Sequence, residues 1–280
     1  METGVVFKCN GRQLLGILHV PEAAKRLGVV IVVGGPTYRI GSHRQFVLLS
    51  RRLAAQGYAG IRFDYRGMGD SEGDERSFQE IQEDIRAAID CLRAHVPDVQ
   101  AVVLWGLCDA ATAICLSLAR LEKVSGVTML NPWVRSEQTL ARSYIRSYYA
   151  KRLLSAANWR RLFNARIDLR NSARDFLAVL RVVFWPSATK RVEVSLAQRL
   201  LSGLGGFSGS VLIILSGNDL TAAEFREAMR GSKEWQQITA EETLTLRELQ
   251  TANHTFSKRE WRGRVEEWTI EWLDGLCGTS

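Results

Sequence analysis

The sequence lacks any long hydrophobic run. Apolar stretches such as Val29–Val33 fall far short of the roughly 20 residues that a membrane-spanning helix requires. The first residues, Met1–Gly4, also lack the basic stretch followed by an apolar stretch that marks a secretory signal peptide. We therefore expect a cytoplasmic protein without stable membrane insertion. Repeats and low-complexity tracts are missing too, and the composition of the 280 residues, 46% of them hydrophobic, fits a globular protein with one large core.

Cysteine is scarce and scattered. The five cysteines form no CxxC pair and no His/Cys spacing suited to a metal. An odd number without an export signal predicts free thiols in a reducing compartment. The G-x-G-x-x-G pattern of dinucleotide-binding proteins is absent as well, so we expect neither a metal nor an organic cofactor. Small apolar packing explains four of the cysteines, and Cys108 is the exception.

Positive charge is in excess, but only in one part of the chain. The net charge is +7, and the range 135–199 holds 14 Lys and Arg against 4 Asp and Glu. The remainder is slightly acidic, which argues against nucleic-acid binding by the main domain. We predict that residues 135–208 form a basic, mostly helical cap inserted into a core made of residues 1–134 and 209–280. Its aromatic and Arg-rich segments suit helix faces that pack on a core, a lid that binds an anionic group, or a membrane-surface helix.

Strand and helix patterns alternate along the chain. Short β-branched runs bounded by glycine suit strands buried on both faces of a parallel sheet. Alternation with amphipathic helices predicts an α/β fold with a mostly parallel, eight-stranded sheet flanked by helices. Strands are predicted at residues 5–8, 13–18, 28–35, 58–64, 101–105, 126–132, 210–217 and 244–249. Helices are predicted at residues 44–56, 77–94, 109–121, 222–231 and 259–276.

Cys108 stands where a predicted strand meets a predicted helix. Gly106 and Ala110, two positions on either side of it, provide the small residues that a nucleophile elbow requires. The helix that begins at Asp109 directs its free N–H groups and positive dipole end at the thiol, which favours a thiolate. We expect the Asp109 carboxylate to point into the first turn of that helix. The alternative is a polar contact with substrate.

The acid and the base follow in the order nucleophile, acid, histidine. Asp219 lies at the end of the strand 210–217, and His254 follows the last strand. His254 is therefore the expected base, with Asp219 to hold its tautomer. His43 is the only serious rival and is expected at the pocket mouth.

Several motifs together resemble the α/β-hydrolase superfamily. Residues 64–71 resemble its D-x-R-G-x-G-x-S loop, and the resemblance covers the whole chain except the cap. The segments 34–45 and 106–110 resemble a narrower group, exosortase A system-associated hydrolase 1. That group occurs with bacterial exopolysaccharide and protein-sorting loci, and its substrate is not established. A cysteine nucleophile in this fold is similar to that of dienelactone hydrolases.

The oxyanion hole departs from the pattern of many relatives, which place a His-Gly at the end of the corresponding strand. Here the strand ends in Gly34-Gly35-Pro36, and proline has no N–H to donate. The first donor is then the amide of Gly35, Thr37 or Tyr38, with Thr37 favoured. The second donor is the amide of Asp109.

These residues predict an acyl-transfer enzyme for an ester, lactone or thioester. The charge of the cap predicts a small, anionic acyl substrate, bound by Tyr38, His43, Arg160 and Arg161. Acyl transfer to a sugar or protein acceptor would use the same acyl-enzyme. A scaffold of the same fold, without turnover, in a polysaccharide-synthesis complex is the alternative outside enzymes. The sequence does not predict the oligomeric state.

Overall fold

The computed structural model describes residues 1–35, 37–134 and 195–278. One sheet runs through it, in the strand order β1-β2-β4-β3-β5-β6-β7-β8. β2 pairs antiparallel with β1 and β4, and every other pairing is parallel. The expected mostly parallel, eight-stranded sheet is confirmed. The strands are β1 (Glu2–Cys9), β2 (Arg12–His19), β3 (Leu27–Val32), β4 (Gly60–Phe63), β5 (Ala101–Leu107), β6 (Val124–Leu130), β7 (Ser210–Ser216) and β8 (Leu244–Leu249).

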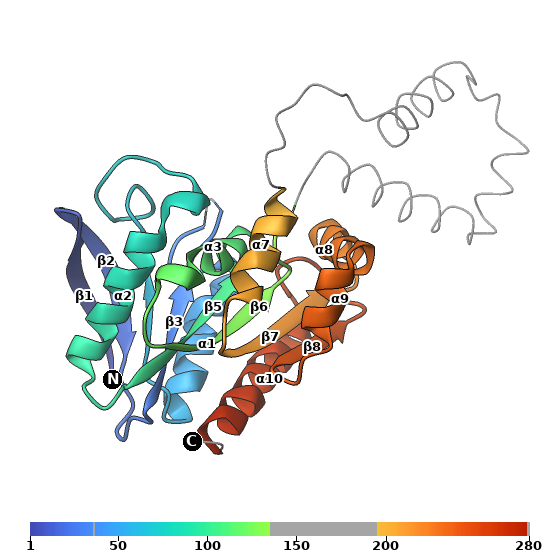
Figure 1. Ribbon diagram of the computed structural model, residues 1–280. Helices are drawn as coiled ribbons and strands as arrows, with labels where there is room; N and C mark the ends of the chain where they lie inside the picture. Colours follow the sequence, from blue (N-terminus) through green and yellow to red (C-terminus); the bar gives the residue numbers. More distant parts are fainter. Residues whose placement is uncertain (36, 135–194, 279–280) are drawn as a thin grey trace, which may run out of the picture.

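Helices flank the sheet on both faces (Figure 1). Within the described ranges, no helix is both long enough and apolar enough to be a membrane span. The α-helices are α1 (Gln45–Ala55), α2 (Gln82–His95), α3 (Asp109–Ser117), α7 (Leu196–Gly205), α8 (Leu220–Gly231), α9 (Lys233–Thr239) and α10 (Arg259–Gly278). Short 3-10 turns are η1 (Ser42–Arg44), η2 (Phe78–Glu80) and η3 (Leu118–Arg120).

Two hydrophobic clusters form the core, one on each face of the sheet. α1 and α10 pack on one face, where Phe46 meets Trp105 edge to face at 5.7 Å between ring centroids. α2, α3, α7 and α9 pack on the other face. All six residues of β3 are buried, as its unbroken apolar sequence predicts for a strand covered on both sides.

The structure differs from the predicted helices in three places. The helix expected from residue 77 begins as the 3-10 turn η2 and continues as α2. α9 is an additional helix. Its 7 residues are too few to give a clear helical periodicity in the sequence. α7 lies inside the range predicted for the cap, yet it packs on α3 so closely that a Cβ at Gly203 would come within 2.3 Å of the Cys115 carbonyl oxygen. The limits of the cap stay a prediction, because residues 135–194 lie outside the described residues.

Candidate active site

Cys108 occupies a strained turn between β5 and α3. Its φ of 61° and ψ of −121° place a non-glycine residue in a conformation that costs free energy. The turn is tight, because a Cβ at Gly106 would lie 2.8 Å from the backbone nitrogen of Ala111. Ala110 is fully buried beneath it. The small residues that the sequence places around Cys108 are therefore required by this geometry, which leaves the thiol half-buried at the start of a helix.

His254 and Asp219 come together from loops that follow different strands. Nδ1 of His254 lies 2.9 Å from Oδ2 of Asp219. Asp219 is also the N-cap of α8 and accepts a hydrogen bond from the backbone N–H of Ala222 at 3.0 Å. The two loops pack closely at Gly217. A Cβ added to this glycine would lie 2.1 Å from the carbonyl oxygen of Gln250. A glycine at the end of β7 thus allows the acid to approach the base.

Hydrogen bonds shift the pKa values of both groups. Hydrogen bonding to Asp219, and then to Cys108, raises the pKa of His254 to about 10, against the opposing effect of burial. Burial acts to raise the pKa of Asp219, but the hydrogen bond and positive charge of His254 outweigh it and hold that pKa below its ordinary value. The imidazole is therefore positioned between a carboxylate and the Cys108 thiol and is protonated at neutral pH.

Asn131 supports this arrangement, and its role was not predicted from the sequence. Its side chain donates from Nδ2 to the carbonyl oxygen of His254 at 2.9 Å and accepts from the backbone N–H of Ser216 at 2.9 Å. It is fully buried and has a φ of 43°. The one signal in the sequence is an asparagine at the end of the strand, because asparagine tolerates the left-handed region better than most residues. Asn131 links the ends of β6 and β7 to the loop that carries the base.

A cavity of about 370 Å³ opens beside the thiol. Its walls combine the reactive groups with apolar side chains. The described residues that line it are Gly34, Gly35, Thr37, Ser42, Gln45, Phe46, Phe78, Leu107, Cys108, Asp109, Trp133, His254 and Thr255. Among the described residues, no three His, Cys, Asp or Glu side chains gather into a possible metal site.

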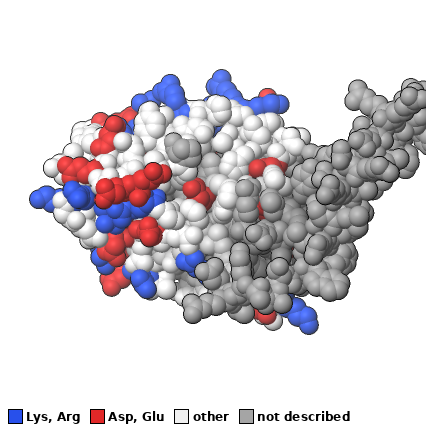
Figure 2. Space-filling model, turned by 90° about the horizontal axis from the view of Figure 1, so that it is seen from above, with Lys and Arg blue, Asp and Glu red and all other residues white. Residues whose placement is uncertain are grey.

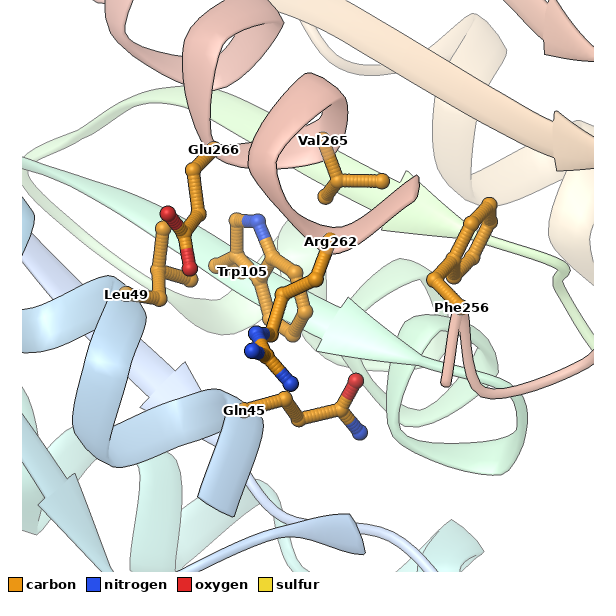
Figure 3. Close-up of a pocket in the computed structure, with 7 residues that line it drawn as sticks. All are labelled: Gln45, Leu49, Trp105, Phe256, Arg262, Val265 and Glu266. Carbon is orange, nitrogen blue, oxygen red and sulfur yellow. The ribbon is translucent and has the colours of Figure 1, made fainter. Parts of the chain in front are cut away.

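A second cavity lies on the other side of Gln45, between α1, α10 and β5 (Figure 3). It measures about 10 Å³, close to the room that one water molecule needs. Trp105, Arg262 and Glu266 are among the residues around it, but neither Cys108 nor His254 is. The larger cavity is therefore the candidate active site.

Some predicted site residues need correction. The backbone N–H of Gly35 already donates to Oδ2 of Asp109 at 2.6 Å, so it is not a free oxyanion donor. His43 and Tyr38 are not among the residues that line the cavity, and the Tyr38 side chain is exposed beside Arg39. His43 adopts a φ of 54° within η1.

Two further predicted residues lie at the cavity, and a predicted pair falls outside the described residues. Thr37 and Asp109 both line the cavity. The Asp109 carboxylate accepts from the N–H of Ala110 in the first turn of its own helix at 3.0 Å, the contact that was expected, and with its other oxygen from Gly35. Arg160 and Arg161 lie outside the described residues.

Comparison with known proteins agrees with this fold. The model of the alpha/beta hydrolase family matches residues 29–257. The quorum-quenching protein AidA of Acinetobacter baumannii (strain MDR-ZJ06) is 29% identical over 135 residues, which are 46% of this chain and 43% of that protein, so the match spans less than half of the relative.

Solved structures add similarity of fold. An esterase of Pyrococcus furiosus superimposes with a TM-score of 0.65 at 15% identity, over 98% of this chain and 91% of the esterase. A Butyrivibrio proteoclasticus protein with bound ferulic acid gives a TM-score of 0.60 at 15% identity, over 96% and 99% of the two chains. With a family model that spans most of its length, the chain belongs to the alpha/beta hydrolase family.

Proposed function

We propose that the protein hydrolyses an ester, lactone or thioester through a covalent acyl-enzyme on Cys108. The observation that carries the proposal is the thiol at a φ of 61° on the elbow, with His254 beside it and Asp219 2.9 Å behind the imidazole. Nucleophile, base and orienting acid in this arrangement support covalent catalysis. The similarity to an esterase fold favours an ester-like bond.

The chemistry proceeds in two halves. The Cys108 thiolate attacks the carbonyl carbon, and the oxyanion is held by backbone amides at the start of α3 and in the loop after β3. The carbon–oxygen or carbon–sulfur bond to the leaving group breaks, and the leaving group takes the proton from protonated His254. His254 then accepts a proton from water, which attacks the thioester and releases the acid. Asp219 keeps the ring oriented in both halves.

The cavity favours an uncharged acyl group. Phe46, Phe78, Leu107 and Trp133 supply apolar walls, and no Lys or Arg is among the described residues that line it. On the face seen from above in Figure 2, charged side chains stand mainly toward one side and the edge, while the middle is largely uncharged. A negative charge on the substrate, which the basic composition of residues 135–199 predicts, would then belong to the other end of the substrate molecule.

The biological setting is proposed on the resemblance alone. The segments 34–45 and 106–110 favour a place among exosortase-associated hydrolases, in exopolysaccharide-linked metabolism. Acyl transfer to a sugar or protein acceptor, in place of water, uses the same acyl-enzyme. The fate of the acyl-enzyme in a single turnover separates the two, because a hydrolase releases the free acid in water, whereas a transferase keeps the acyl-enzyme until a sugar or amine acceptor is added.

A panel of p-nitrophenyl esters tests the proposed function. The wild-type protein should release p-nitrophenol from butyrate and benzoate esters, and iodoacetamide should abolish this turnover with one modification at Cys108. Esters whose acyl group ends in a carboxylate should react more slowly. Absence of turnover on all esters and on thioesters, with a Cys108 no more reactive than exposed Cys277, would support the scaffold instead.

A further inference from the structure

The side chain of Asp109, the residue after the proposed nucleophile, is hydrogen-bonded to the loop that follows β3. Asp109 is the first residue of α3, and its Oδ2 accepts the N–H of Gly35, beyond the end of β3, at 2.6 Å. Its Oδ1 accepts the N–H of Ala110 at 3.0 Å. Burial raises the pKa of Asp109, and the two backbone N–H groups oppose that effect. Both carboxylate oxygens are therefore engaged by backbone amides of the two segments that border the cavity.

The loop is shaped to receive this carboxylate. A Cβ at Gly34 would lie 2.1 Å from Oδ1 of Asp109, so only glycine leaves room there. Gly35 has a φ of 61°, in the left-handed region that favours glycine. The hydroxyl of Thr37 donates to the carbonyl oxygen of Gly34 at 2.6 Å and closes the turn. The two glycines that replace a His-Gly in this chain thus form one unit with Asp109.

A second carboxylate holds the far end of the same loop. Asp64, which is fully buried, accepts the N–H of Arg39 at 2.7 Å and pairs with its guanidinium. The carbonyl oxygen of Arg39 accepts from Arg62 at 3.2 Å. Thr37 and Tyr38 therefore lie in a short segment that is fixed at Gly35 by one acid and at Arg39 by another.

We propose that Asp109 is a positioning residue that holds the loop after β3 against the nucleophile elbow, so that the Thr37 amide faces the carbonyl under attack. Preorganised donors lower the barrier only when they stay fixed before the charge develops. The proposed base and acid of the Cys108 thiol are His254 and Asp219, but the charge of Asp109 also acts on His254, so the test has to separate positioning from charge. The catalytic part of this inference rests on the proposed function, whereas the contact between loop and elbow can be tested without a substrate.

Hydrogen exchange provides the test that needs no substrate. In Asp109→Ala, peptides that cover residues 34–41 should exchange about tenfold faster or more, because a charge-assisted hydrogen bond is lost. Asp109→Asn keeps an acceptor for Gly35 and should show a smaller increase. Peptides from β6 report whether the variant is folded, and Asp90→Ala, an exposed acid on α2, is the matched control. Unchanged exchange of the loop in a folded Asp109→Ala overturns the proposal.

Kinetics distinguish positioning from an effect of charge. With p-nitrophenyl butyrate, Asp109→Ala should lose about 10- to 100-fold in kcat with KM within about threefold, and Asp109→Asn should recover most of it. The rate of Cys108 alkylation by iodoacetamide should not fall in either variant. Equal losses in both variants, with a shifted pH profile of alkylation, would show that the charge matters and contradict the proposal. A wild-type protein inert toward the ester would refute the proposed function, while hydrogen exchange would still decide whether Asp109 holds the loop.

Discussion

The two ends of α3 each carry a cysteine, and their surroundings are opposite. Cys115, near the end of the helix, is 1% exposed, contacts the sulfur of Met129 at 3.3 Å, and has its pKa raised by burial. Cys108, just before the helix, is half-buried, strained and next to His254. The same side chain is thus a small core residue at one end and a candidate nucleophile at the other. Backbone geometry and a neighbouring imidazole make the difference.

The largest expected difference is in ester turnover, between variants in which Cys108 or Cys115 is replaced by alanine. Cys108→Ala should reduce ester turnover by about 10⁴-fold or more, since the nucleophile is removed. Cys115→Ala should keep activity within about twofold and lower the Tm by about 2–4 °C through a small cavity. Initial rates and thermal unfolding of both variants measure this. Similar losses of activity in the two variants would contradict a nucleophilic role for Cys108 alone.

The next largest effect should come from the acid. Asp219→Asn keeps the shape of the side chain but no longer stabilises protonated His254, so kcat should fall by about 10³- to 10⁴-fold. Turnover of p-nitrophenyl butyrate measures it. Asp90→Asn, on the exposed side of α2, is the matched control. A loss of less than tenfold would mean that His254 does not depend on this carboxylate.

A smaller effect should follow from filling the elbow. Gly106→Ala places a methyl group 2.8 Å from the Ala111 nitrogen, which should destabilise the protein by about 1–3 kcal/mol and disturb the turn at Cys108. Gly263→Ala, in α10, meets nothing within 4 Å and should be neutral or stabilising by about 0.5–1 kcal/mol. Urea unfolding compares the two variants. Equal free energies of unfolding in the two variants would show that the turn at Cys108 can accommodate a Cβ at residue 106.

The smallest effect concerns pH. The pKa of His254 is raised from 6.5 to about 10. The hydrogen bonds of the protonated imidazole therefore stabilise the folded protein fully below pH 6.5. This stabilisation is lost as the pH rises through 10. His254→Gln should therefore lower the Tm by a few degrees at pH 6 and by less near pH 10. His95→Gln, at the exposed end of α2, is the control. A Tm difference for His254→Gln that grows with pH would contradict the raised pKa.

Local patterns were enough to predict the strand-to-helix turn at Cys108. The glycine and alanine around Cys108 follow from the sterics of a strand-to-helix turn, and the mostly parallel sheet follows from the alternation of strands and helices. Chain order selected His254 and Asp219, although nothing local shows that they meet. Contacts between distant segments could not be predicted. The link from Asp109 to Gly35 and the two hydrogen bonds of Asn131 exist only once β3, β5, β6 and β7 lie side by side.

Trapping the acyl group tests the central claim most directly. The wild-type protein would be mixed with p-nitrophenyl butyrate, quenched in acid within the first turnover, and mapped by peptide mass spectrometry. We predict a butyryl mass on the peptide that carries Cys108, absent from Cys108→Ala and accumulating in His254→Gln or Asp219→Asn if these slow deacylation more than acylation. An acyl group on another residue, or turnover that persists in Cys108→Ala, would contradict the account.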